Sequence, residues 1–277
     1  MKPLQKPDWR SVHALMARDL LVVRRSKSVI LPIILVPLLL LVLLPAGICI
    51  AMPMMDTADT YQDLKQLMAM IPPEMQADFA YDTPQQTLLA LILVHMFAPL
   101  FLILPMMVAS TIAAGSFAGE KERKTLEALL YTPLSDLELI LGKVMSAWLP
   151  ALGVTMVGFL LYSIVVNAAG WPTMGRVFFP NALWVALVIW VAPAAAGLGL
   201  SAVVLISSKV STFQDAYQLS GMVVLPVVLL MLGQVGGVIY LSLPFVLLIG
   251  MLLWLIDAGL LWLGVRTFRR TEIIARL

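Results

Sequence analysis

The chain has 277 residues, of which 61% are hydrophobic and only 12% are charged, and its net charge is +2. Because a soluble domain carries about 25% charged residues, this composition excludes an ordinary soluble protein and predicts an integral membrane protein. The single cysteine, Cys49, excludes a disulfide framework within the chain, and two distant histidines give no indication of a zinc site.

The N-terminal arm, residues 1–28, is predicted to contain an amphipathic helix. Asp8 is a favourable N-cap, and apolar residues then recur every three to four positions, with Arg10, Arg18 and Arg24 between them. This pattern is typical of a helix that lies on a membrane surface; the alternative is that the first membrane helix simply extends into the cytosol. The apolar positions are Trp9, Val12, Met16, Leu20 and Val23.

Six membrane spans are predicted between residues 29 and 265. A bilayer core needs about 20 apolar residues per helix, and four of the five charge-free stretches can each hold one helix. The fifth stretch, 216–256, is too long for one span and is interrupted near Gly236, so it is interpreted as two helices joined by a tight turn. The predicted spans are 29–51, 87–114, 144–167, 180–206, 217–234 and 238–265.

The basic residues predict the orientation of these spans. Seven Lys and Arg residues precede residue 28, four lie in the loop 115–143, Lys209 follows the fourth span, and four lie in the basic tail 266–277. The opposite side holds only Lys65 and Arg176. Because cytoplasmic loops are enriched in Lys and Arg, both termini and the loop 115–143 are expected in the cytoplasm.

The outer segment 56–84 is expected to carry a short amphipathic helix. Leu64, Leu67, Met68 and Ile71 follow helical spacing, and two prolines end the pattern. Thioethers can bind Cu(I), but three methionines beside a membrane span are more often packing residues. No metal site is therefore predicted at Met52, Met54 and Met55.

The loop 115–143 contains the densest charge in the chain, "GEKERKTLEALLYTPLSDLELILGK", from Gly119 to Lys143. A charged helix start is followed by a leucine stripe, and the helix is expected to stop before Pro133. Ser135 and Glu138 then form the pattern of a capping box, which predicts a new helix leading into the third span. A plain solvated connector needs neither the stripe nor the capped restart, so the stripe is expected to be covered by lipid headgroups or by another protein. The fold class is therefore all-α, with six transmembrane helices and a helical cytoplasmic loop between the second and third.

Four polar side chains inside the spans are candidates for lining a transport pathway. Asp257 is the only acid within a predicted span, and such residues usually face a cavity or a partner; the alternative is a structural hydrogen bond or a protonated carboxyl. His95, Asn167 and Gln234 are the other candidates. A lone histidine within a span is more often a packing residue, and Asn167 and Gln234 could line an exit path near the outer side.

The loop motif closely resembles the cytoplasmic signature of ABC-2 type permeases, the membrane subunits of one class of ATP-binding cassette exporters. The segments "MMVASTIAAGSFA" and "RDLLVVRRSKSVILPIILVPLLLL" resemble the same family. The nearest likeness is to the sodium-efflux (NatB-like) group, although the outer segment 56–84 is much shorter than the large insertion of many such members.

This resemblance implies a division of labour between subunits. Two permeases, identical or homologous, would pair with two copies of an ATPase subunit that binds ATP and Mg²⁺, and no P-loop occurs in this chain. The loop would dock on the ATPase as a coupling helix, beside the amphipathic connecting helix, in the cytoplasmic (inner) membrane of a prokaryote. No catalytic residue, no cofactor on this chain and no nucleic-acid partner is expected. The implied coupling residues are Glu120, Lys121, Glu122, Arg123, Thr125, Leu126, Leu129, Thr132 and Pro133, and those of the connecting helix are Trp9, Val12, Met16, Arg18 and Leu20.

Two other functions stay open at this point. The chain could be an ion-coupled secondary transporter in which Asp257 and His95 bind protons or Na⁺, or a membrane scaffold without transport activity. The resemblance favours the permease of an exporter.

Overall fold

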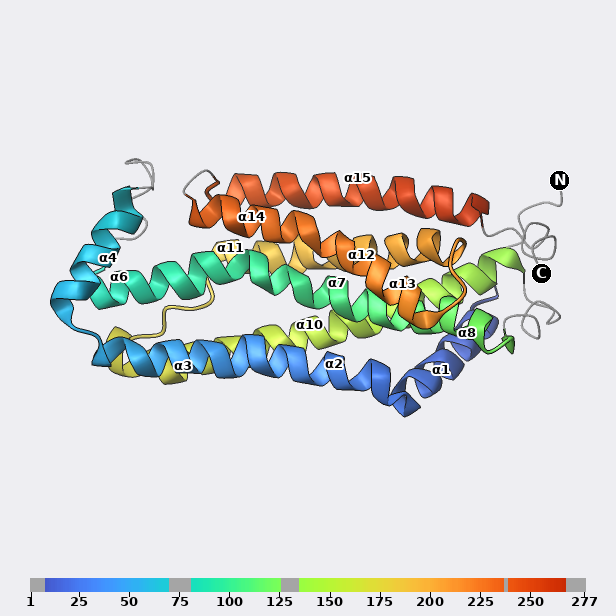
Figure 1. Ribbon diagram of the computed structural model, residues 1–277, viewed down its shortest axis with the longest axis horizontal. Helices are drawn as coiled ribbons and strands as arrows, with labels where there is room; N and C mark the ends of the chain where they lie inside the picture. Colours follow the sequence, from blue (N-terminus) through green and yellow to red (C-terminus); the bar gives the residue numbers. More distant parts are fainter. Residues whose placement is uncertain (1–7, 70–80, 126–134, 237–238, 268–277) are drawn as a thin grey trace.

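A computed structural model describes residues 8–69, 81–125, 135–236 and 239–267 of the chain (Figure 1). Within these ranges the secondary structure is helical, with no strand. Six helices are long and apolar enough to cross a membrane, which confirms the predicted number of spans. They are Lys27–Met54, Pro84–Glu122, Leu137–Met174, Ala182–Ser207, Phe213–Val235 and Leu243–Leu263.

The N-terminal arm forms α1 (Trp9–Arg25), which meets the first span at an elbow. The Asp8 carboxylate accepts a hydrogen bond from the Arg10 amide at 3.0 Å, so the predicted N-cap is confirmed. Ser26 takes an extended conformation and separates α1 from the first span. That span is built from α2 (Lys27–Pro37), a π-helical turn η1 (Leu38–Leu43), α3 (Leu44–Ala51) and η2 (Met52–Met54). The π-turn begins directly after Pro37, whose missing amide disturbs the regular ladder.

The second and third spans are longer than the predicted 87–114 and 144–167. The second runs through α6 (Pro84–Ala90), the π-helical turn η4 (Leu91–Met96), α7 (Phe97–Ser116) and α8 (Ala118–Glu122). The third is a single helix, α10 (Asp136–Met174), which ends at Gly175 in the left-handed conformation that favours glycine. Ser135 and Glu138 exchange the two hydrogen bonds of a capping box, as predicted. A short helix, α4 (Thr57–Ala69), lies in the outer segment.

The last three spans complete the bundle. The fourth comprises α11 (Ala182–Ala186), η5 (Leu187–Val191) and α12 (Ala192–Ser207). The fifth comprises α13 (Phe213–Ser220), η6 (Gly221–Val224) and α14 (Leu225–Val235), and the sixth is α15 (Leu243–Thr267). The predicted division of the long apolar stretch is confirmed, because α14 ends at Val235 and is followed by a turn at Gly236.

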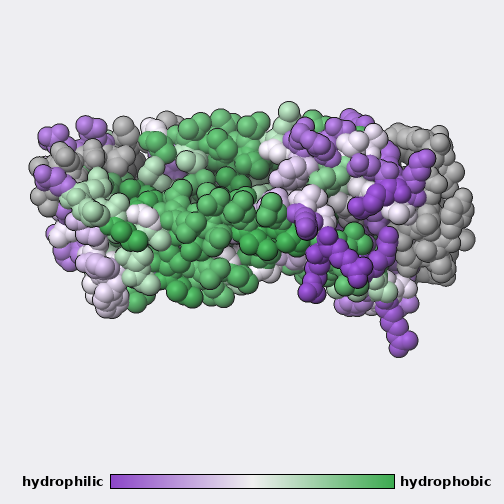
Figure 2. Space-filling model, turned by 60° about the horizontal axis from the view of Figure 1, so that its bottom comes forward, coloured by the Kyte–Doolittle hydropathy of each residue, from purple (hydrophilic) through white to green (hydrophobic). Residues whose placement is uncertain are grey.

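The second and fourth spans form the centre of the bundle. In their most apolar stretches 72% and 61% of the residues are buried, against 11% to 28% for the other four spans. The outer spans therefore leave broad leucine-rich faces exposed. Figure 2 shows these faces as an apolar band between two polar ends, which is the surface expected of a protein surrounded by lipid.

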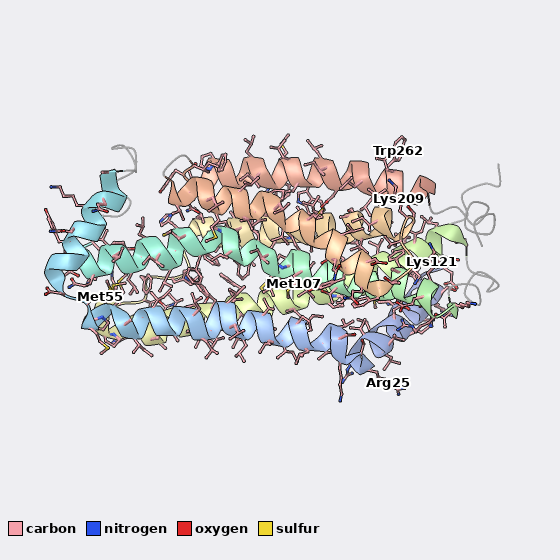
Figure 3. All side chains as sticks on the ribbon, viewed as in Figure 1. Arg25, Met55, Met107, Lys121, Lys209 and Trp262 are labelled. Carbon is pink, nitrogen blue, oxygen red and sulfur yellow. The ribbon has the colours of Figure 1, made fainter. Side chains whose placement is uncertain are left out.

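One polar end, here called the α8 end, contains α1, α8, the start of α10 and the end of α12 (Figure 1). Arg25, Lys121 and Lys209 lie at this end, whereas Met55 lies at the opposite end (Figure 3). These three basic residues thus lie where the sequence predicts the cytoplasmic side.

Three side chains support the π-helical turn η4 in the middle of the core. A π-turn disturbs the regular backbone ladder, and here three consecutive carbonyls accept hydrogen bonds from three other helices. Leu93 O accepts from Tyr162 Oη at 2.6 Å, Val94 O from Trp184 Nε1 at 2.6 Å, and His95 O from Gln234 Nε2 at 2.8 Å. The irregular turn is therefore clamped by α10, α11 and α14.

We expect Tyr162→Phe to destabilise the protein by about 1 kcal/mol, because it removes the donor to a buried carbonyl while retaining the ring. The thermal unfolding midpoint of the detergent-solubilised protein measures this loss. Tyr61→Phe is the control, since Tyr61 is 59% exposed on α4. Equal midpoints for Tyr162→Phe and the wild type would show that this hydrogen bond does not stabilise the turn.

Candidate functional site

A lysine ammonium is buried at the α8 end. Lys143, in the second turn of α10, has a side chain that is 0% exposed. Its Nζ donates to Glu120 Oε2 at 2.7 Å, to Ser116 O at 2.6 Å and to Ser116 Oγ at 3.1 Å. The ammonium also lies 5.2 Å from the centroid of the Phe117 ring. Each of the three N–H groups of the ammonium thus has an acceptor within the chain. Such hydrogen bonding is required when a charge is buried.

Two charged residues of α1 reach the same place. Asp19 Oδ2 accepts from Ser116 Oγ at 2.8 Å and from Ser146 Oγ at 3.4 Å, and it lies 3.9 Å from Lys143 Nζ. Arg18 bonds Glu120 Oε1 at 3.0 Å, so the Glu120 carboxylate is held between two cations. Burial raises the pKa of Asp19, and the nearby Lys143 opposes that shift. We call Arg18, Asp19, Ser116, Glu120, Lys143 and Ser146 the Lys143 cluster.

The Lys143 cluster joins three parts of the chain that are distant in sequence. Arg18 and Asp19 belong to α1, Ser116 ends α7, Glu120 lies in α8, and Lys143 and Ser146 lie in α10. Breaking a buried ion pair by removing one partner leaves an uncompensated charge. The cluster therefore opposes separation of α8 from α1 and α10.

The capping carboxylate of α10 also holds the start of α1. Glu138 Oε1 accepts from the Asp8 amide at 2.7 Å, and its Oε2 accepts from the Ser135 amide at 2.7 Å. One side chain thus caps two helix N-termini. A few residues further on, Gly142 allows close packing, because a Cβ there would lie 2.7 Å from Leu15 Cδ2.

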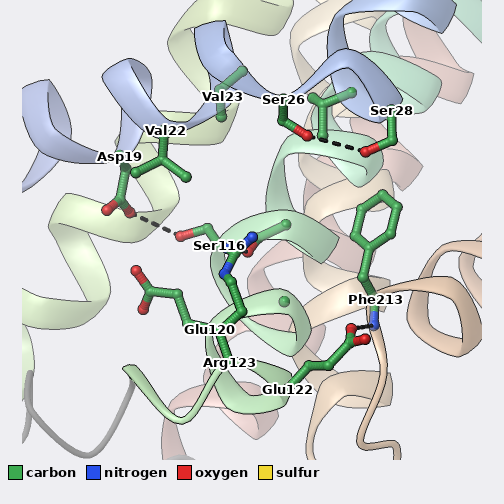
Figure 4. Close-up of a pocket in the computed structure, with 13 residues that line it drawn as sticks. Asp19, Val22, Val23, Ser26, Ser28, Ser116, Glu120, Glu122, Arg123 and Phe213 are labelled. Atoms are coloured by element: carbon green, nitrogen blue, oxygen red, sulfur yellow. Dashed lines mark hydrogen bonds between the residues drawn. The ribbon is translucent and has the colours of Figure 1, made fainter.

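The turn of α8 is bonded to the beginning of the fifth span. Lys121 Nζ donates to Val210 O at 3.0 Å, and Glu122 Oε2 accepts from the Phe213 amide at 2.8 Å (Figure 4). Between α8, α13 and the elbow of α1 and α2 lies a cavity of about 310 Å³. Its walls include Val23, Ser28, Arg123 and Phe213 as well as carboxylates of the Lys143 cluster (Figure 4).

The structure places the expected coupling residues in two groups. Glu120 is 4% exposed and is bonded inside the Lys143 cluster, so the carboxylate that we expected to face a partner is engaged within the chain. Lys121 and Glu122 make the contacts to the fifth span, while Arg123 and Thr125 are exposed, with weaker bonds to Gly115 O and Glu120 O. The remaining expected residues lie outside the described ranges: Leu126, Leu129, Thr132 and Pro133.

The expected connecting helix packs against α10 through one face. Val12 and Leu15 are buried, Met16 and Leu20 are partly buried, and Trp9 is 54% exposed. Asp19 and Lys143 were missed by the sequence analysis. Asp19 shares the spacing of Val12, Leu15 and Val23, so an acid on the buried face of an amphipathic helix was the available signal.

The four candidate pathway residues do not form one site. Asn167 bonds the backbone of Phe178 and Phe179, which fixes the connection to the fourth span. Gln234 and His95 are brought together, and the His95 ring stacks on Tyr240 at 5.9 Å.

Asp257 lies apart from His95 and Gln234. It is about 20 Å along α15 from Leu243, the first residue of that helix, which follows Tyr240 closely in sequence. It is 3% exposed and packs against Gly197 of α12. A paired ion site made of Asp257 and His95 is therefore not formed. In the part of the chain that the structure describes, no group of three His, Cys, Asp or Glu residues could hold a metal ion.

The chain matches the model of one protein family. The family model described as "ABC-2 family transporter protein" matches residues 13–270, which is most of the chain. No curated protein and no solved structure matches the chain.

We expect Lys143→Met to destabilise the protein by about 3 kcal/mol or more, because it leaves the Glu120 and Asp19 carboxylates buried without their main cation. Adding Glu120→Gln should recover part of this loss, since one uncompensated charge is then removed. Thermal unfolding of the single and double variants measures the coupling between the two residues.

Lys209→Met is the matched control, because Lys209 is an exposed lysine at the same end of the bundle. Strict additivity of Lys143→Met and Glu120→Gln, or a loss no larger than that of the control, would show that the Lys143 cluster does not hold the helices together.

Proposed function

Because the chain belongs to the ABC-2 transporter family, whose permeases generally work with an ATP-binding cassette ATPase, we propose that it is the permease subunit of an ATP-driven exporter. It forms the translocation pathway and receives force from a separate ATPase subunit through the loop 115–143. ATP and Mg²⁺ bind to that subunit, and this chain performs no chemistry itself.

The observation that carries this proposal is the attachment of α8 to three other elements. The Lys143 cluster connects α8 to α1 and α10, and Lys121 and Glu122 connect it to the start of the fifth span. A displacement of the loop after α8 therefore acts on α1, on the third span and on the start of the fifth span together. A solvated connector would need none of these bonds.

We assign the surface for the ATPase to the exposed residues at the end of α8 and to the sequence that follows them. Glu120 is bonded within the Lys143 cluster. We therefore assign direct contacts with the partner to Arg123, Thr125 and the apolar residues Leu126 and Leu129 of the sequence pattern. This assignment changes the role of Glu120 from a docking residue to a positioning residue.

The proposed orientation is supported by charge. The α8 end carries Arg25, Lys121 and Lys209 (Figure 3), and an excess of Lys and Arg is typical of the cytoplasmic side, where the ATPase would reach this end. Both termini are then cytoplasmic, α1 lies at the inner membrane surface, and the membrane is the cytoplasmic membrane of a prokaryote.

Two permease copies and two ATPase copies make up the transporter in this proposal. The first, fifth and sixth spans have only 22%, 11% and 17% of their apolar stretches buried, so they offer faces for a second copy as well as for lipid. The sodium-efflux likeness stays a prediction that a transport assay with Na⁺ would decide.

We expect Leu129→Asp to reduce recovery of the ATPase subunit with the tagged permease by tenfold or more, because a charge in an apolar docking stripe is left desolvated without a partner. Candidate P-loop ATPases are taken from the reading frames adjacent to that of this chain, co-expressed with it and captured through the permease tag. ATPase activity of the captured complex is the second readout.

Lys65→Glu serves as the control, since Lys65 is exposed on α4 at the opposite end of the bundle. It should leave capture and activity unchanged. Full capture by the Leu129→Asp variant, or failure of the wild-type chain to capture any P-loop ATPase, would contradict the proposed coupling.

A further inference from the structure

A buried carboxyl group lies in the interior of the sixth span. Asp257 is 3% exposed, and neither of its side-chain oxygens has a hydrogen-bond partner among the described residues. The other buried carboxylates of the described residues have partners: Asp19 and Glu120 each lie beside a cation and accept hydrogen bonds. Asp257 therefore departs from the rule that buried charges are paired.

A glycine of α12, Gly197, faces the Asp257 carboxyl group. A Cβ on Gly197 of α12 would lie 2.3 Å from Asp257 Oδ2 and 2.9 Å from its Cγ. Any side chain other than hydrogen would therefore collide with the carboxyl group. The glycine creates a recess in α12 that accepts the carboxyl as α15 packs against it.

The described elements that pack most extensively on Asp257's helix offer this carboxyl group no counter-charge. The elements that pack most extensively on α15 are α12, η5 and α11, and the sequence from Ala182 to Ser207 contains no Asp, Glu, His, Cys, Tyr, Lys or Arg. The sequence of α14, from Leu225 to Val235, contains none either. The next cation along α15 is Arg266, nine residues further on and about 13 Å away along the helix axis.

We propose that Asp257 is a proton-binding site within the membrane-spanning bundle: the carboxyl carries a proton while α15 packs against Gly197, and ionises when these helices separate. An unpaired charge in a membrane interior is strongly disfavoured, and the neutral acid is the form that this apolar recess can hold. On separation the proton passes to water that enters the seam between α12 and α15. The site binds H⁺ and takes no larger ligand in the packed state.

A direction of pH dependence follows. Protonated Asp257 favours the packed seam, so lower pH holds α12 and α15 together and higher pH favours their separation. The inference concerns this chain alone and does not depend on the ATPase, so it can fail while the proposed coupling stands.

Infrared spectroscopy of the full chain in phospholipid nanodiscs near neutral pH tests the proposal. The difference between the wild type and Asp257→Asn should contain the C=O stretch of a protonated carboxyl, which the variant lacks. Because asparagine is a neutral mimic of similar shape, the variant should unfold at nearly the wild-type temperature. Carboxylate bands in place of the C=O stretch, with or without added Na⁺, would overturn the proposal and indicate an ion-paired or cation-bound group.

Two glycine variants test the role of the recess. Gly197→Ala should convert the protonated band at neutral pH largely into carboxylate bands, because the added methyl group forces the seam apart. Gly259→Ala is the matched control on α15, since a Cβ there meets nothing within 4 Å, and it should retain the wild-type spectrum. Identical spectra for both variants would show that the recess does not control the proton.

Chemical modification tests the protonation of Asp257 without any variant. The reagent is dicyclohexylcarbodiimide, an apolar compound that adds to protonated carboxyl groups. On the wild-type chain near pH 7, modification of Asp257, located by mass spectrometry, should exceed that of the exposed Glu122 by tenfold or more. Modification of Asp257 at or below the level of Glu122 would count against a protonated carboxyl.

Discussion

The structure at the α8 end depends on the burial of one ammonium group. Lys143 is fully enclosed, and its charge is tolerated only because Glu120, Asp19 and Ser116 reach it from α8, α1 and the end of α7. Desolvating a charge costs several kcal/mol unless such partners are in place. The positions of three helices at this end are therefore set by a single side chain, and none of the three can move away without exposing an unpaired charge.

This constraint also explains how a short helix is held to a large bundle. The five-residue α8 has little packing surface of its own, yet ion pairs and hydrogen bonds hold it to α1, α10 and the start of α13. Glu138 adds a second joint by capping α1 and α10 together. The apolar bundle beyond is held differently, by the buried second and fourth spans and by the aromatic donors that clamp η4. Polar contacts thus hold the α8 end together, whereas apolar and aromatic packing holds the bundle beyond it.

Much of this architecture could be predicted from local patterns. Apolar length gave six spans, and the Asp8 cap, the Ser135–Glu138 capping box and the turn at Gly236 follow from short-range rules. The Lys143 cluster could not be predicted, because its partners Asp19 and Lys143 are 124 positions apart and no local period relates them. For the same reason Glu120 was expected to face a partner. The π-turns and the recess at Gly197 arise from tertiary packing, which cannot be predicted from the spacing of apolar residues in the sequence.

The proposed coupling requires α8 and α1 to move as one body when the loop 115–143 is displaced. Spin labels at the exposed Arg10 and Lys124 of one permease copy, in the complex with its ATPase, measure their separation by pulsed electron paramagnetic resonance without nucleotide and with ATP trapped. The account predicts one unchanged distance distribution in both states, while the distance between the Arg24 positions of the two copies shifts. A change in the separation of Arg10 and Lys124 on ATP binding would contradict the rigid joint.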